Sequence, residues 1–147
     1  MSLRLGVLVL LLVTAHCGNG LEERKTLYEN GQIKETWTVK LDSDNNYIAH
    51  GKYIAWYENG QKKQVEYWKD GKLNGSFITW HDNGMKHQVG SYKDGNMDCL
   101  YREYEPLGQK IVEGEVIDGK QEGKWTYWDE KGNIFKQEDY KNGELIE

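Results

Sequence analysis

Along this chain, short runs of alternating apolar and polar residues are separated by dipeptides of Asn or Asp followed by Gly. The segment 69–84, KDGKLNGSFITWHDNG, has one such dipeptide near each end and a run with Phe77 and Trp80 between them. Asn-Gly and Asp-Gly are typical of two-residue type I′ hairpin turns, in which both central residues have φ > 0. Runs of about seven residues between such turns match the usual length of a β-strand. The pattern therefore predicts hairpins, with type I′ turns at Asn59-Gly60, Asp70-Gly71, Asn83-Gly84, Asp94-Gly95, Asp118-Gly119 and Asn142-Gly143.

The whole pattern repeats every 24 residues. The spacing is kept by two complete series of turn glycines and by a third series in which Cys99 replaces one glycine. Gly31 lies 29 residues before Gly60, so the first unit is longer, and the polar segment 41–46 is the expected place for its extra residues. The series are Gly60, Gly84, Gly108 and Gly132; Gly71, Gly95, Gly119 and Gly143; and Gly51, Gly75 and Gly123.

Aromatic residues follow the same period in three columns, in which Val116 is the one residue that is not aromatic. Residues at equivalent positions of successive units fall into rows across a sheet, where ring contacts add to stability. We expect the third glycine series to leave room for such rings. The aromatic columns are Trp56, Trp80, Tyr104 and Trp128; Tyr53, Phe77, Tyr101 and Trp125; and Trp68, Tyr92, Val116 and Tyr140.

A 24-residue unit has room for two strands and two turns but not for a crossover helix, so neighbouring strands must be antiparallel. We therefore predict an all-β fold, an elongated single-sheet antiparallel meander of two-stranded repeats over residues 21–147. A two-layer sandwich is the alternative, but only 37% of the residues are hydrophobic, and many of these lie in the N-terminal segment. The predicted units span residues 27–50, 51–74, 75–98, 99–122 and 123–147.

Residues 1–17 have the pattern of a secretory signal peptide, with Arg4 before an apolar run over residues 5–13. This run is too short to span a bilayer, which takes about 20 residues. The alternative is a buried N-terminal strand or helix of the fold. The end of the segment, VTAHC, resembles the lipobox of bacterial lipoproteins, although His16 stands where a small residue is usual. Either Cys17 is acylated and attaches the chain to the outer or cytoplasmic membrane, or an ordinary signal peptidase cuts nearby. Both alternatives predict a secreted or cell-envelope protein.

Charge and cysteine content exclude two classes of protein. The formal net charge is −5, whereas nucleic-acid binding requires a basic patch, so we predict no nucleic-acid partner. Cys99 is the only cysteine after Cys17, which excludes a disulfide framework within the repeats. As a nucleophile Cys99 would need an activating base beside it, and its place in a glycine series favours a structural role.

Two segments have features of metal sites. His81 and His87 flank the Asn83-Gly84 turn and would face each other across a three-residue loop, but the sequence provides no third ligand. The segment 42–47, DSDNNY, begins like a calcium loop but lacks its glycine, and its twelfth position is Tyr53 instead of Glu. We therefore predict no metal, no cofactor and no catalytic residue.

The segments 51–75 and 123–143 resemble the bacterial variant of the MORN repeat, which reads loosely G-K-aromatic-x-x-aromatic-Y-x-N-G followed by Y-K-D-G. The resemblance covers residues 27–147, with Cys99 and Val116 as departures. Similar proteins include envelope lipoproteins and antitoxins paired with secreted toxins, and related eukaryotic repeats are linked to membranes and scaffolding. The resemblance implies a repeat scaffold without a catalytic group.

These observations predict a non-enzymatic, secreted or lipid-anchored scaffold that binds another protein, with an immunity or antitoxin-like role. The alternative is a glycan-binding module of the cell envelope that uses exposed aromatics, and a hydrolase or metalloprotein ranks below both. A further alternative is that the rings serve only the sheet. The candidate binding residues are Tyr53, Trp56, Trp68, Phe77, Trp80, Tyr92, Tyr101, Tyr104, Trp125 and Trp128.

Overall fold

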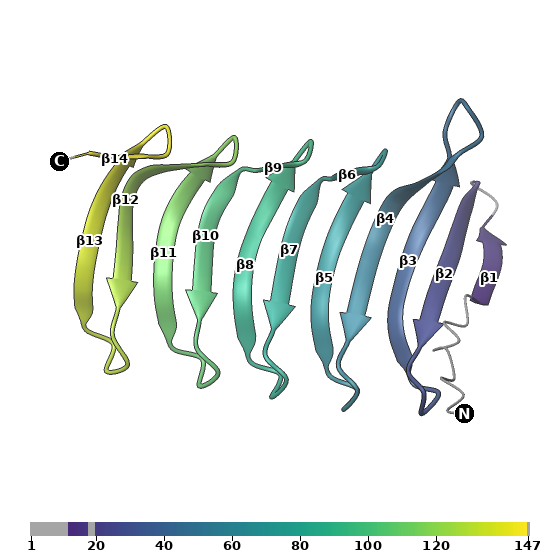
Figure 1. Ribbon diagram of the computed structural model, residues 1–147, viewed down its shortest axis with the longest axis horizontal. Coiled ribbons are helices and arrows are strands. Elements are labelled where there is room, and N and C mark those ends of the chain that lie inside the picture. The colour runs from purple at the N-terminus through teal and green to yellow at the C-terminus, as the bar shows by residue number, and fades with distance from the viewer. Residues whose placement is uncertain (1–11, 18–19, 147) are drawn as a thin grey trace, which may run out of the picture.

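The computed structural model describes residues 12–17 and 20–146. Over these residues the regular structure is entirely β, and its strands form one antiparallel sheet of 14 strands (Figure 1). This part of the chain has no helix of the length and apolarity needed to cross a membrane. The strands are β1 (Leu12–Cys17), β2 (Leu21–Leu27), β3 (Ile33–Leu41), β4 (Tyr47–Trp56), β5 (Lys62–Lys69), β6 (Lys72–Leu73), β7 (Gly75–Trp80), β8 (Lys86–Lys93), β9 (Asn96–Met97), β10 (Cys99–Tyr104), β11 (Lys110–Ile117), β12 (Lys120–Trp128), β13 (Ile134–Lys141) and β14 (Glu144–Ile146).

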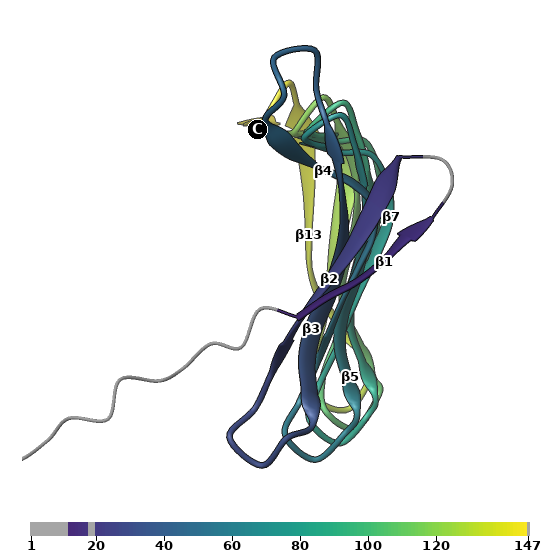
Figure 2. The same ribbon diagram turned by 90° about the vertical axis from the view of Figure 1, so that its right-hand side faces the viewer.

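The sheet is an open meander, because strands that are neighbours in the sequence are also neighbours in the sheet. The two-residue strands β6 and β9 pair with β5 and β8, and β7 and β10 then continue along the same two partner strands. Viewed along the row of strands, the described chain is one twisted and curved layer, with no second layer packed against it (Figure 2). The predicted single-sheet meander is confirmed, and the sandwich alternative is wrong.

The single layer buries little of the chain. Five apolar residues of the described part are buried, and none of its large side chains is completely enclosed. The sheet is therefore held together by its strand ladder, its turns and partly buried side chains instead of a closed core. The buried apolar residues are Val39, Ala55, Phe77, Val116 and Trp125.

The predicted leader is only partly described. Residues 1–11 and 18–19 lie outside the described residues, whereas Leu12–Cys17 forms β1 and pairs with β2. Signal-peptide cleavage and acylation of Cys17 both stay predictions.

At one end of the strands the chain forms the predicted type I′ turns. In the turn between β5 and β6, Asp70 has φ 52° and Gly71 has φ 78°, and the flanking Lys69 and Lys72 pair with each other. Both central residues also have positive φ values in the turns at Asp94-Gly95, Asp118-Gly119 and Asn142-Gly143.

The turns at the opposite end of the strands differ from the prediction. Gly60 has φ 84°, but Asn59 is not among the residues with positive φ. Tyr57 N–H donates to Gln61 O at 2.8 Å and Gly60 N–H donates to Tyr57 O at 2.9 Å, which defines a three-residue loop with the glycine in the left-handed region. The type I′ prediction is therefore wrong for Asn59-Gly60 and Asn83-Gly84. The Asn59 side chain stabilises this three-residue loop, because its Oδ1 accepts the Gln61 N–H at 3.0 Å.

Both rows of turns are hydrogen-bonded to the neighbouring unit, which explains why the period is so constant. In the row of type I′ turns, each turn glycine donates its N–H to a carbonyl 22 residues earlier. Gly71 donates to Ala49 O at 2.9 Å, and Gly119 donates to Met97 O at 2.7 Å. Beside the three-residue loops at the other end of the strands, the Tyr57 hydroxyl donates to Trp80 O of the next unit at 2.7 Å. A one-residue insertion in either row would remove these bonds.

The extra length of the first unit lies between β3 and β4, the tallest loop in Figure 1. Leu41 and Tyr47 extend the strand pair and enclose a five-residue loop where the other units have two residues. The Asp42 Oδ1 atom accepts the backbone N–H groups of Asp44 and Asn46, both at 2.9 Å. Hydrogen bonds from these amides, chiefly that of Asn46, lower the pKa of Asp42. The acidic residue at the start of DSDNNY is thus bonded to its own loop.

Candidate functional site: an aromatic face with an acidic groove

Aromatic side chains contact one another, within and between units, on one face of the sheet. The rings of Phe77 and Tyr92 have centroids 5.2 Å apart, and Trp125 lies 6.1 Å from Tyr101 and 6.3 Å from Tyr140. These distances are within the range in which aromatic pairs attract each other. We call these five residues the ring row.

Two glycines outside the predicted series lie beneath the ring row. A Cβ atom on Gly114 would lie 2.2 Å from Trp125 Cδ2, and one on Gly90 would lie 2.5 Å from Phe77 Cε1. Neither glycine has a positive φ, so both positions require glycine because of the ring above them. The sequence did not predict their role.

The expectation that the third glycine series leaves room for rings is largely wrong. A Cβ atom on Gly75 would meet Tyr67 at 3.2 Å, but Gly51 faces Thr38, and nothing lies within 4 Å of the Cβ position of Gly123. These three glycines instead share positive φ values of 95°, 120° and 64°, in sequence order. Their common requirement is a backbone conformation that other residues rarely adopt.

The ten predicted binding residues do not form one surface. Tyr53 and Trp56 are three positions apart on β4, so their side chains leave opposite faces. Phe77 and Trp125 are buried, with exposed fractions of 7% and 6%. The remaining eight are partly exposed, so the rings support the sheet and still present surface to solvent: Tyr53, Trp56, Trp68, Trp80, Tyr92, Tyr101, Tyr104 and Trp128.

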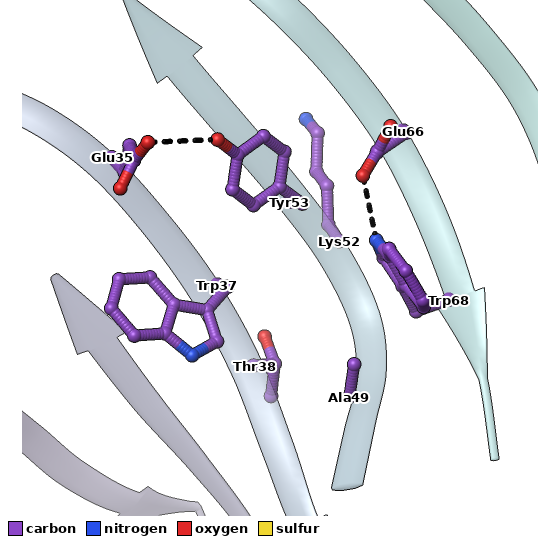
Figure 3. Close-up of a pocket in the computed structure, with 8 residues that line it drawn as sticks. All are labelled: Glu35, Trp37, Thr38, Ala49, Lys52, Tyr53, Glu66 and Trp68. Atoms are coloured by element: carbon purple, nitrogen blue, oxygen red, sulfur yellow. Dashed lines mark hydrogen bonds between the residues drawn. The ribbon is translucent and has the colours of Figure 1, made fainter. Parts of the chain in front are cut away.

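A groove with a volume of about 290 Å³ lies over β3, β4 and β5 (Figure 3). Rings of Trp37, Tyr53 and Trp68 and the carboxylates of Glu35 and Glu66 define it, and we call these five residues the acidic aromatic groove. Its other lining residues are Thr38, Ala49 and Lys52.

Within the groove the two carboxylates are fixed by hydrogen bonds from neighbouring rings. The Tyr53 hydroxyl donates to Glu35 Oε1 at 3.1 Å, and Trp68 Nε1–H donates to Glu66 Oε1 at 2.8 Å. Burial and the negative charges of Glu35 and Glu66 raise the pKa of Tyr53, so its hydroxyl is a stable donor. The groove is therefore a preorganised, negatively charged site with aromatic walls.

Sequence analysis identified Tyr53 and Trp68 but missed Glu35, Trp37 and Glu66. Allowing for the longer first unit, Trp37 occupies the same repeat position as Glu66. These residues could have been found by comparing the charged residues, and not only the rings and glycines, at equivalent positions of the units.

The two histidines occupy a structural position. Their rings are 4.4 Å apart, as the three-residue loop predicts, and His87 Nε2 lies 3.4 Å from Glu103 Oε1. His81 Nε2–H donates to Tyr104 O at 2.8 Å, the bond that Tyr57 makes one unit earlier. This nitrogen carries a proton because a carbonyl only accepts, so it is not free to bind a metal. Within the described ranges, no group of three His, Cys, Asp or Glu residues could hold a metal ion.

Replacing His81 with tyrosine should leave the free energy of unfolding within about 0.5 kcal/mol of the wild type, because a hydroxyl restores the Tyr57-type bond. Replacing His81 with phenylalanine removes the donor and should cost about 1 kcal/mol. Urea denaturation with and without zinc measures both effects. A tyrosine variant as unstable as the phenylalanine variant, or a wild type stabilised by zinc, would contradict the structural role.

Cys99 is a free, partly exposed thiol in β10. Unlike the glycines of its series, it does not have a positive φ. Its Sγ would lie 3.0 Å from a Cβ atom on Gly90, so the thiol packs over that glycine beside the ring of Phe77. These contacts agree with the structural role that the sequence favoured.

The family model of the MORN repeat variant matches three segments, residues 23–41, 49–70 and 121–142. Three MORN-variant repeats are thus present in this chain. The three matches end at equivalent positions of the repeat, and the strand pairing and the turn-to-turn bonds continue through the intervening residues. The MORN-variant repeats identify the chain as a repeat scaffold of a kind that generally binds other molecules. A comparison with curated proteins finds no match.

Proposed function

We propose that this protein with MORN-variant repeats is a non-catalytic scaffold, secreted or lipid-anchored through Cys17, that binds another protein through the sheet face that bears the ring row and the acidic aromatic groove. One observation carries the proposal: four candidate rings on this face, those of Tyr53, Trp68, Tyr92 and Tyr101, are partly exposed on a single-layer sheet that no second layer covers. Interface cores are enriched in Tyr, Trp and Phe, and an extended row of such rings suits a protein surface.

Within this proposal, an immunity or antitoxin-like role is the finer statement. A secretion leader would bring the chain to the compartment where it meets a secreted toxin. Its acidic balance, with a net charge of −5, suits a partner with a basic surface.

A photo-crosslinking experiment tests protein binding on the ring-bearing face. Tyr101 belongs to the ring row, and the adjacent Leu100, which is 46% exposed, leaves the other face of β10. With p-benzoylphenylalanine at Tyr101 we expect one discrete protein adduct in cells, and with the same group at Leu100 none. Identical adducts from both positions, or none from either, would contradict the proposal.

Glycan binding is the second candidate, because Trp37 and Trp68 lie beside carboxylates that can accept bonds from sugar hydroxyls. Titration of the purified protein with wall and surface polysaccharide fragments tests it through Trp fluorescence. A saturable change with a fragment, together with no Tyr101 crosslink, would favour this candidate over protein binding.

A further inference from the structure

We propose that the acidic aromatic groove binds a lysine or arginine side chain of the protein partner. The inference rests on the proposed function and specifies the chemistry that the partner must present. It starts from two carboxylates that the sheet itself does not need.

The repeat shows that the architecture does not require these acids. At the repeat position of Glu35 the later units have Gln64, Gln88, Val112 and Lys136. At the position of Glu66 the next two units have the glycines beneath the ring row. A second groove of about 290 Å³, which includes Phe77 and Trp125, has no charged residue in its lining. The fold therefore forms an aromatic groove equally well without carboxylates.

The last unit provides a matched comparison for Glu66. There Glu138 takes the same repeat position, and Lys136 Nζ lies 2.7 Å from its Oε1 atom. On β5 the residue two positions before Glu66 is Gln64, whose Nε2–H donates to Glu66 Oε2 at 2.6 Å. The geometry is equivalent, but the counter-ion is present in β13 and replaced by a neutral amide in β5.

Glu35 is likewise held by neutral donors, the hydroxyls of Tyr53 and of Thr26, the latter at 3.3 Å. Among the ion pairs of the described residues, none involves Glu35 or Glu66. The nearby Arg24 is bound to Glu22 at 2.9 Å and lies 4.1 Å from the ring centroid of Tyr47. The charge of the groove is therefore not neutralised by these side chains.

The groove lining contains one cationic residue, Lys52. It precedes Tyr53 on β4, so its side chain leaves the opposite face. In Figure 3 the carboxylates of Glu35 and Glu66 lie on either side of Tyr53, with the indole of Trp37 below Glu35 and that of Trp68 below Glu66. The groove volume of about 290 Å³ leaves room for one extended side chain.

A basic side chain is the occupant that this chemistry fits best. Its methylene groups would pack on the indole rings, its charge would lie over aromatic faces, and its N–H groups would bond to the carboxylates. A sugar hydroxyl could also bond to a carboxylate, but it leaves two partly buried negative charges without compensation. Charge complementarity thus favours a cation over a neutral glycan.

A matched pair of peptides tests the proposal directly. The probes are two capped pentapeptides that differ only in a central arginine or its neutral isostere citrulline, titrated into the full-length protein at low salt. NMR records the indole Nε1–H signals of Trp37 and Trp68. We expect saturable shifts with the arginine peptide, at least about tenfold weaker binding of the citrulline peptide, and weaker binding of the arginine peptide as salt rises.

Three variants identify the groups responsible. Glu66→Gln keeps an acceptor for Trp68 but removes the charge, and Gln64→Lys copies the Lys136–Glu138 pair and supplies a counter-ion from the chain itself. Each should weaken binding of the arginine peptide about tenfold. The control Glu138→Gln removes an acid at the same repeat position of the last unit and should not change the affinity.

The outcomes distinguish this inference from the proposed function. Equal shifts with both peptides, no shift at either indole, or an unchanged affinity in Glu66→Gln would overturn the inference. Shifts of these indoles by a neutral oligosaccharide but not by the arginine peptide would assign the groove to a glycan. If the Tyr101 crosslink forms equally well in Glu66→Gln, the scaffold function stands and the groove is not its partner site. If no crosslink forms in the wild type either, the proposed function itself fails.

Discussion

Replacing Gly114 with alanine should lower the free energy of unfolding by about 3 kcal/mol, one of the two largest effects expected for a single substitution in this protein. The added methyl group would lie 2.2 Å from Cδ2 and 2.3 Å from Cε2 of Trp125, well inside van der Waals contact. Backbone strain does not contribute, because Gly114 has no positive φ. The loss of stability therefore measures the steric clash with the Trp125 ring that covers this glycine.

Chemical denaturation of Gly114→Ala and of the double variant Gly114→Ala, Trp125→Ala measures the clash. In the Trp125→Ala background there is no indole to displace, so adding the Gly114 methyl group should cost less than about 0.5 kcal/mol. Equal costs of the alanine in both backgrounds would refute the steric explanation. The analogous substitution at Gly90, where Phe77 lies 2.5 Å from the Cβ position, provides a second test.

Truncating Trp125 to alanine should cost about 3 kcal/mol and should destabilise mainly the C-terminal units. The side chain is 6% exposed, contacts Tyr101 and Tyr140, and donates its Nε1–H to Glu115 O at 3.1 Å. Loss of a buried aromatic side chain typically costs about 3–5 kcal/mol, and the open single layer places this site at the lower end.

Hydrogen exchange resolved by residue is the appropriate measurement, because units of a repeat protein interact mainly with their neighbours. Protection should fall in β11, β12 and β13 and change little in β3 and β4. Phe135→Ala is the control, since this ring on β13 is 65% exposed and its loss should cost about 0.5 kcal/mol. A uniform loss of protection across the sheet would show that the chain unfolds as one cooperative unit.

Much of the fold could be predicted from the sequence because its signals are local and repeated. A type I′ turn needs two residues with φ > 0, and Asp-Gly meets this need at Asp70, Asp94 and Asp118 without reference to the rest of the chain. Asn59-Gly60 was predicted wrongly because the same dipeptide also fits a three-residue loop. In the three-residue loop the Asn59 side chain accepts a bond from the Gln61 backbone and donates to Asp82 O of the neighbouring unit, 2.7 Å away. Leu107 takes the same position in an equivalent loop, so the dipeptide alone does not determine the turn type.

Part of the site was also predictable. Periodicity identified the rings of Tyr53 and Trp68, since a fixed spacing places equivalent residues in rows. It did not identify Glu35 and Glu66, because acids on exposed strands are common and their sequence positions say nothing about a missing counter-ion. Recognising that absence required the measured pairs, above all the contrast between Gln64–Glu66 and Lys136–Glu138.

By itself, the sequence determined the β class, the 24-residue period, the meander and the choice of rings, because each of these follows from local turn chemistry and regular spacing. Only the tertiary structure decided that Gly90 and Gly114 lie under rings and that carboxylates from β3 and β5 flank Tyr53 in one groove. The physical reason is register. Side-chain alternation fixes which residues of one strand share a face, but pairing between strands, including the bulge between Trp37 and Val39, decides which side chains meet.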